Sequence, residues 1–166
     1  MRHLIKRKDK GFTMVELIVA IAIFSIVITI VVSLFMTALK GYRKNLALQN
    51  VQDNARFMVD FIAKELRMAT INSGTSNSLN ITRSDGTAVT YLLSSNNLTR
   101  TAGGTSGPIN SDEVTVNGNF YVSGIGGDSF QPKVTIGLKV ENKGTRPEEK
   151  AVINIQTTLS QRNLDI

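Results

Sequence analysis

The chain is dominated by an apolar run, LIVAIAIFSIVITIVVSLFMTAL, which extends from Leu17 to Leu39 and contains no charged residue. As a helix, these 23 residues (39 − 17 + 1) span roughly 35 Å, enough to cross a bilayer core of about 30 Å. A buried helix of a soluble protein usually shows a polar face. The only polar side chains here are Ser25, Thr29, Ser33 and Thr37. The run therefore predicts a transmembrane helix.

These four hydroxyl residues recur every four positions and so form one stripe on the helix. Two roles are open. Small hydroxyl residues let helices approach closely in lipid. Alternatively, each hydroxyl bonds back to a carbonyl of the preceding turn and does nothing else.

A secretory signal peptide is the competing interpretation of the run. Its apolar core would be about 7–15 residues long and would end at a small-x-small cleavage site. This run is longer, and Met36-Thr37-Ala38 matches such a site poorly, so we expect the segment to stay in the mature protein. Residues 1–11 carry five basic side chains against one acid, which predicts a cytoplasmic N-terminus. Lys40, Arg43 and Lys44 on the other side weaken that orientation signal.

Charge and composition remove several classes of function. The net charge is +6 (19 − 13), but residues 70–166 carry eight basic and eight acidic side chains and are neutral. Strong attraction to nucleic acid phosphates is therefore not expected of this part. The chain has no cysteine, and its one histidine is His3. Thiolate chemistry, Cys-ligated zinc and His-based catalysis are thereby disfavoured, and we do not expect an enzyme.

The segment before the apolar run reads Lys10-Gly11-Phe12-Thr13-Met14-Val15-Glu16. It resembles the processing site of type IV pilins and pseudopilins, in which a basic leader ends in Gly, Phe follows, and a Glu stands four residues later. The resemblance covers about residues 1–40. It implies that prepilin peptidase removes the leader, residues 1–11, by cutting after Gly11 and then methylates the new amine of Phe12.

The same resemblance implies a structural subunit of a type IV pilus, a type II secretion pseudopilus or a competence pseudopilus. Glu16 of an incoming subunit would pair with the Phe12 amine of a neighbour, so that two charges costly in lipid neutralise each other. The implied partners are prepilin peptidase, other pilin or pseudopilin subunits and an assembly platform in the cytoplasmic membrane. No cofactor is implied. The protein would lie in that membrane before it reaches a filament at the cell envelope or surface.

Three short segments resemble minor pilins and J- or W-type pseudopilins more narrowly. They are Val89-Thr90-Tyr91, Leu98-Thr99-Arg100 and Leu159-Ser160-Gln161-Arg162-Asn163. The chain departs from many family members in having no Pro within residues 12–69, where Gly41 is the only helix breaker. We therefore expect a more continuous helix that bends near Gly41.

Beyond the apolar run, apolar residues recur at steps of three and four, which predicts an amphipathic helix over 40–71. They are Leu48, Val51, Ala55, Met58, Ile62, Leu66 and Ala69. Together with the transmembrane and assembly helix over 12–39, this predicts one rod of about 58 residues. Packing of its apolar stripe against the remaining chain is favoured over a coiled coil, since strands follow.

The rest of the chain, residues 72–166, predicts an antiparallel sheet domain. The Ser- and Asn-rich stretch Asn72–Asn80 is typical of a loop. Two hairpins follow: Leu79–Arg83 with Thr87–Leu93 around Ser84-Asp85-Gly86, and Val114–Val116 with Asn119–Val122 around Asn117-Gly118, a pair that suits a type I′ turn.

Apolar residues alternate with polar ones in Lys133–Val140 and in Ala151–Leu159, so each predicts a strand with one buried face. Lys143–Glu149, with Gly144 and Pro147, would turn between them. The expected fold is α+β: a long N-terminal helix packed on an antiparallel β-sheet. Pilin-like proteins share this plan.

No other segment of the sequence predicts a catalytic or ligand-binding site. The acid pairs Asp112-Glu113 and Glu148-Glu149 are typical of a solvated surface. Calcium binding by Asp112, Glu113 and Asp128 would lack the usual D-x-D-x-D loop, so no metal site is expected. Gly103-Gly104 and Gly124–Gly127 are interpreted as flexible loops. Two further functions remain as alternatives, a monomeric membrane-anchored module that binds a surface and a DNA-uptake pilin.

Overall fold

The computed structural model describes residues 11–125 and 131–162, apart from the side chain of residue 148. The leader up to Lys10, the glycines at 126 and 127, Asp128 and Asn163 lie outside these ranges. The chain forms two compact units, Met1–Gly41 and Tyr42–Ile166. Helix α1, Met14–Arg67, supplies residues to both units.

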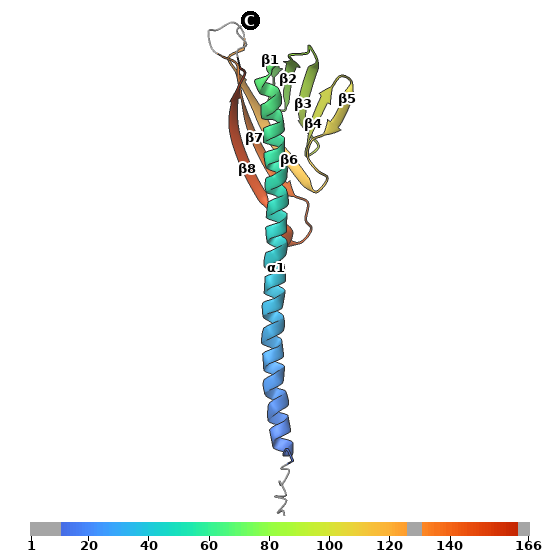
Figure 1. Ribbon diagram of the computed structural model, residues 1–166, viewed down its shortest axis with the longest axis vertical. Helices are drawn as coiled ribbons and strands as arrows, with labels where there is room; N and C mark the ends of the chain where they lie inside the picture. The colour runs from blue at the N-terminus through green and yellow to red at the C-terminus, as the bar shows by residue number, and fades with distance from the viewer. Residues whose placement is uncertain (1–10, 126–130, 163–166) are drawn as a thin grey trace, which may run out of the picture. The chain divides into compact units, whose positions relative to one another are not determined.

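In the first unit, the apolar part of α1 has no buried residue between positions 14 and 38. α1 is long and apolar enough to cross a membrane, and none of its most apolar window is covered by other parts of the chain. A buried core helix is therefore not what this segment forms. α1 carries a single label in Figure 1, and its bounds, Met14–Arg67, include Gly41 without a break, which confirms the continuous helix expected from the lack of proline.

The hydroxyl stripe of this segment bonds to its own helix. Ser25, Thr29 and Thr37 donate to carbonyls four residues earlier at 2.8, 2.8 and 2.9 Å. Ser33 donates to the Ile30 carbonyl at 2.8 Å. Every donor of the stripe is therefore used within its own helix, as the back-bonding interpretation expects.

The second half of α1 buries one face, as its periodicity predicts. Its buried residues are Ala47, Val51, Ala55, Met58, Ile62, Ala63 and Leu66. Leu48 was expected in this set but is 39% exposed. The buried residue one turn before Val51 is Ala47, four positions earlier, and not Leu48, three positions earlier. Ala69 is buried, but it begins a strand, since the helix ends at Arg67.

Five strands follow in a five-stranded antiparallel meander: β1 Ala69–Gly74, β2 Ser78–Arg83, β3 Ala88–Ser94, β4 Asn97–Ala102 and β5 Thr105–Pro108. The expected hairpin of β2 and β3 is confirmed, with Gly86 at φ 81° in its turn. That left-handed conformation favours glycine.

The interpretation of Asn72–Asn80 as a loop was wrong in extent, because β1 continues to Gly74 and β2 begins at Ser78, so that only residues 75–77 connect them. β1 pairs with β2, with a register irregularity between Ile71 and Ser73. Side chains reinforce the pairing: Asn72 Nδ2 donates to Thr82 Oγ1 at 2.7 Å, and Asn80 Nδ2 donates to Ser73 Oγ at 3.0 Å. The polar residues that resemble a loop in the sequence here make cross-strand bonds.

Strands β4 and β5 were not expected. β3 and β4 are joined by Ser95 and Asn96, both at positive φ, and β4 and β5 by Gly103 and Gly104, also at positive φ. Two such residues in a row are the geometry of a type I′ hairpin turn. Gly103-Gly104 is therefore a tight turn rather than the flexible loop that we inferred.

The second sheet has the order β6-β7-β8, with β6 Val114–Ser123, β7 Lys133–Asn142 and β8 Val152–Ser160. The predicted burial of alternate residues in β7 is confirmed. In β8 the inward apolar residues are only half-buried but pack against the core. A short helix, η1 Pro147–Glu149, lies in the expected turn between β7 and β8.

The hairpin predicted around Asn117-Gly118 was wrong. β6 runs straight through both residues and pairs along its length with β7. A Cβ atom added to Gly118 would lie 2.1 Å from the Gly137 carbonyl oxygen. Glycine is present at this position because the backbone of β7 comes too close for a side chain.

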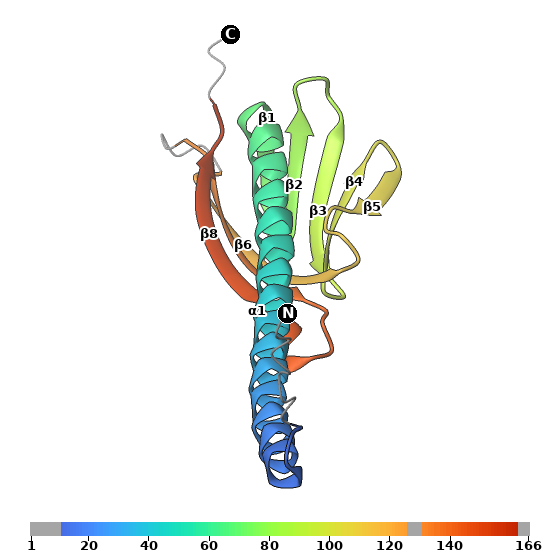
Figure 2. The same cartoon turned by 60° about the horizontal axis from the view of Figure 1, so that its bottom comes forward.

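The core of the second unit lies between α1 and the two sheets (Figure 2). Its largest fully buried side chains include Met58 of α1, Tyr91 of β3 and Phe120 of β6. The sheets are also joined directly, since the backbone N–H of Phe120 donates to the Ser76 carbonyl at 2.9 Å. This architecture confirms the expected α+β, pilin-like fold.

Candidate functional site

The expected processing site is exposed and lies immediately before α1. Gly11 and Phe12 precede the first helical residue, Met14. Phe12 is 81% exposed, and a Cβ atom on Gly11 would meet nothing within 4 Å. Exposed, irregular backbone is the kind of segment that a peptidase can bind.

Thr13 caps the helix that follows. The backbone N–H of Glu16 donates to Thr13 Oγ1 at 3.2 Å, and that of Leu17 donates to the Thr13 carbonyl at 3.2 Å. Thr13 with Glu16 at the third helical position is the sequence pattern of a capping box. This local role was not among the predictions, although the T-x-x-E pattern is visible in the sequence.

Phe12 and Glu16 are close in sequence and both exposed. Among the ion pairs formed by the described residues, none includes Glu16. Its carboxylate lies in the first turn of α1, where the helix dipole favours a negative charge. The geometry thus leaves this carboxylate accessible to a cation from another molecule.

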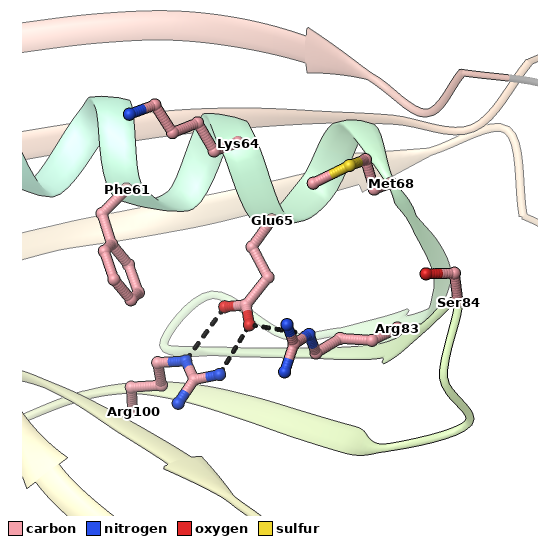
Figure 3. Close-up of a pocket in the computed structure, with 7 residues that line it drawn as sticks. All are labelled: Phe61, Lys64, Glu65, Met68, Arg83, Ser84 and Arg100. Atoms are coloured by element: carbon pink, nitrogen blue, oxygen red, sulfur yellow. Dashed lines mark hydrogen bonds and ion pairs between the residues drawn. The ribbon is translucent and has the colours of Figure 1, made fainter.

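A second polar cluster joins the C-terminal part of α1 to the first sheet (Figure 3). Arg100 of β4 holds both oxygens of Glu65: its Nε donates to Oε2 at 2.9 Å and its terminal nitrogen to Oε1 at 2.6 Å. The Tyr91 hydroxyl donates to Oε2 as well. Arg83 Nε of β2 lies 3.5 Å from Oε1. One carboxylate therefore links a helix to three strands.

This cluster shifts the pKa values of its members. Burial alone would raise the pKa of Glu65, but the hydrogen bonds from Arg100 and Tyr91 and the charges of Arg100 and Arg83 outweigh it, so the Glu65 pKa lies below its usual value. Burial and the bond to Glu65 raise the pKa of Tyr91. Glu65 is thus ionised and Tyr91 neutral at physiological pH.

Sequence reasoning did not identify this cluster. The sequence does contain a signal for Glu65. Alternate steps of four and three residues from Val51 follow the apolar face of the helix through Ala55, Met58 and Ile62 and arrive at Glu65. A carboxylate at the border of a buried stripe needs a partner. The partners themselves, 18 to 35 residues away, could not be chosen from the sequence.

Two of the three acids of the calcium hypothesis lie within the described residues. Asp112 and Glu113 are exposed, and Glu113 Oε2 accepts a hydrogen bond from Asn50 at 3.0 Å. Within residues 11–125 and 131–162, no three His, Cys, Asp or Glu side chains form a group suited to a metal ion. Asp128, the third acid of the calcium hypothesis, lies outside these residues.

Comparison with known proteins locates a family signature at the N-terminal site. Residues 6–32 match the model of the prokaryotic N-terminal methylation motif. No curated protein and no solved structure is similar enough to the chain to count as a match. The N-terminal segment is thus type IV pilin-like, and proteins with this motif are typically structural. The motif implies processing by prepilin peptidase and assembly with pilins, and the apolar helix is consistent with membrane anchoring before assembly.

Proposed function

We propose that this protein is a filament subunit, made as a precursor and polymerised through its apolar helix. Prepilin peptidase cuts after Gly11, removes residues 1–11 and methylates the amine of Phe12. The observation that carries the proposal is the methylation motif over residues 6–32, which includes the start of a helix whose apolar part is not buried by the rest of the chain that the structure describes. Such a surface needs lipid or neighbouring helices to cover it.

The proposed assembly step is a charge pairing between subunits. Cleavage creates an amine on Phe12, and methylation keeps its positive charge. Glu16 of one subunit neutralises the Phe12 amine of a neighbour, because a lone charge in lipid costs several kcal/mol. Both side chains are exposed, and Glu16 is in none of the ion pairs formed by the described residues, which supports this role.

The proposal assigns a role to each part of the chain. Residues 12–39 anchor the subunit in the cytoplasmic membrane, with the leader in the cytoplasm, and later form the filament core. The remainder of α1, up to Arg67, forms the amphipathic helix beyond the membrane, and the strands from β1 to β8 form the β domain. The further partners are an assembly platform in that membrane and other pilin or pseudopilin subunits.

The finer assignment is to a minor pilin or a J- or W-type pseudopilin, which rests on the short likenesses in β3, β4 and β8. The filament is a type IV pilus, a type II secretion pseudopilus or a competence pseudopilus. The assignment as a minor subunit is tested by measuring its abundance in purified filaments relative to the other subunits. A minor subunit should be the less abundant one.

The processing claim is tested by Gly11→Ala. This change adds a side chain at the cut site, where the structure itself offers no obstruction, so a loss of processing would report on the peptidase rather than on folding. Mass spectrometry should find the variant uncut and the wild-type protein beginning at a methylated Phe12. Wild-type protein that retains Met1–Gly11 in cells with active peptidase would refute the claim.

Shearing of cells tests the assembly claim against a monomeric membrane-anchored module. A filament subunit should appear in the sheared fraction together with other pilins. A protein that stays in the membrane fraction after shearing would instead be an anchored module.

A further inference from the structure

The last strand, β8, has a neighbouring strand on one side only. Figure 2 shows it as the outermost strand of the second sheet, where it pairs with β7. Two hydrogen bonds fix which of its residues face β7. The backbone N–H of Asn142 donates to the Ala151 carbonyl, and that of Gln161 donates to the Pro132 carbonyl, each at 3.0 Å. The register of the two strands is constant between these bonds.

The odd-numbered residues of β8 therefore bond to β7, because successive residues of an antiparallel strand face the neighbour alternately. The even-numbered residues direct their backbone N–H and C=O groups to the outer edge. They are Val152, Asn154, Gln156, Thr158 and Ser160. Among residues 11–125 and 131–162, no hydrogen bond engages the backbone of these residues. β8 thus presents an edge of nine residues that is open to pairing.

The other sheet edges in the described part of the chain are protected. β1 has a register irregularity just after Ile71, whose N–H donates to the Gln161 side chain at 3.1 Å. β5 has four residues and ends at Pro108. β6 donates backbone hydrogen bonds to the carbonyls of Ser76 and Asn96. Short strands, proline, irregularities and covering contacts all prevent strand addition. β8, VINIQTTLS, has no charge and no proline, and its pairing with β7 is regular.

The edge at β8 also leaves apolar side chains partly uncovered. The four inward apolar residues of β7 are at most 3% exposed. The inward apolar residues of β8, which are Ile153, Ile155 and Leu159, pack against the core but are only half-buried. The cause is the missing neighbour on the outer side of β8. An added strand with apolar residues on this face would remove more apolar surface from water.

A second folded copy of this chain does not supply that strand. Its open edge is again β8, and two β8 edges keep their apolar residues on one face only if they pair antiparallel. The parts of α1 that pack on this face would then run in opposite directions. In the proposed function every copy inserts with its N-terminus in the cytoplasm, so two copies in one membrane cannot meet in this way. The added strand therefore comes from a different protein.

We infer that the outer edge of β8 binds an extended segment of a different protein, which joins the second sheet as an added strand. The backbone of this segment pairs with the five outward residues of β8. Its apolar side chains lie beside Ile153, Ile155 and Leu159, and its uncharged polar side chains face the solvent. Strand addition at an open edge is a general mode of peptide recognition. The inference rests on the proposed function for the exclusion of a second copy.

Photo-cross-linking from two positions tests the inference in cells that make the full chain. Benzoylphenylalanine replaces Asn154 in one strain and Thr158 in another, since both side chains are exposed at the open edge. Peptide mass spectrometry maps the residues that become cross-linked. They should lie in one segment of another protein and about four residues apart, because paired strands advance together residue for residue.

Gln156→Pro tests whether the backbone edge makes the contact. The N–H that proline removes points away from β7, so the pairing of β7 with β8 is kept. The two cross-links should fall about tenfold or more. Gln156→Thr is the matched control: it removes the same side chain but keeps the N–H, and it should leave the yields unchanged. Gln156→Lys is a second edge variant that keeps the backbone and opposes strand addition with a charge. The urea midpoint of each full chain in detergent shows that it is folded.

Four results would overturn the inference: no cross-link from either position, cross-links only to a second copy, adducts scattered over unrelated segments, or yields that both edge variants leave unchanged. Processing is scored in the same samples by mass spectrometry of the N-terminus. Protein cut after Gly11 that lacks the paired cross-links defeats only the edge inference. Uncut protein in cells with active peptidase that still gives the paired cross-links to another protein defeats only the proposed function.

Discussion

At the scale of single residues, Glu16 combines two roles that the structure allows to be separated. Its backbone N–H belongs to the helix cap on Thr13. Its carboxylate is the proposed partner of the Phe12 amine. The capping-box pattern accepts Gln as well as Glu. The proposed pairing with the Phe12 amine needs a negative charge, which Glu has and Gln lacks.

Glu16→Gln should therefore preserve the cap and processing but reduce the yield of sheared filaments. Thr13→Ala is the matched control: it loses a cap worth about 1 kcal/mol but keeps the charge, and it should still assemble. Processing is measured by mass spectrometry and assembly by the amount of subunit in sheared filaments. Normal filaments from Glu16→Gln would show that the charge is not needed.

Glu65 has three polar partners, Tyr91, Arg100 and Arg83, each on a different strand. Glu65→Gln keeps its shape but removes the charge that Arg100 and Arg83 share. The free energy of unfolding at pH 7 should fall by about 2 kcal/mol, as expected for hydrogen bonds to a charged group. Urea unfolding of the full chain in detergent measures it. Arg83→Gln, at a more exposed ion pair, should cost less than about 1 kcal/mol.

The effect of Glu65→Gln should also depend on pH. The pKa of Glu65 is lowered in the folded protein, so its contribution is fully present above the pKa of the unfolded chain and is lost as pH falls through the folded value. The difference between wild type and Glu65→Gln should thus shrink below about pH 4. A difference that is constant from pH 7 to pH 3 would contradict an ionised Glu65.

At the scale of elements, α1 and β7 have the periodicities that their sequences show, with steps of three to four and of two. β6 behaves differently because its Asn-Gly pair resembles a turn but continues as a strand. The intrinsic turn preference of two residues is small compared with a ten-residue ladder of backbone hydrogen bonds. The cost of a side chain at Gly118 tests this account.

Gly118→Ala places a Cβ atom 2.1 Å from the Gly137 carbonyl oxygen, and backbone cannot move aside cheaply. Unfolding free energy should fall by about 1–3 kcal/mol. Gly107→Ala in β5 is the control, since its Cβ would meet nothing within 4 Å. It should change stability by less than about 0.5 kcal/mol. Equal effects of the two substitutions would rule out the close approach of β6 and β7 as the cause.

At the scale of the whole molecule, the core belongs entirely to the second unit. Its buried cluster begins at Ala47, and α1 supplies part of it alongside both sheets. The first unit contributes no buried residue within positions 14–38. The folded core should therefore not depend on the apolar segment, but it should depend on the second half of α1.

A fragment of residues 42–166 should be soluble without detergent and unfold cooperatively in urea. A fragment of residues 69–166 lacks the seven buried residues of α1 and should aggregate or show no cooperative transition. Circular dichroism during urea unfolding compares the two. Cooperative folding of the shorter fragment would mean that the sheets do not need α1.

What the sequence by itself determined is local in origin. The apolar run, the processing motif, the stripe from Val51 to Leu66 and the alternation in β7 depend on residues within a few positions of each other. Only the tertiary structure decided the strand at Asn72, the role of Gly118 and the partners of Glu65. Each of these depends on segments distant in sequence. Their pairing is set by the packing of α1 and the two sheets around one core, which no local preference encodes.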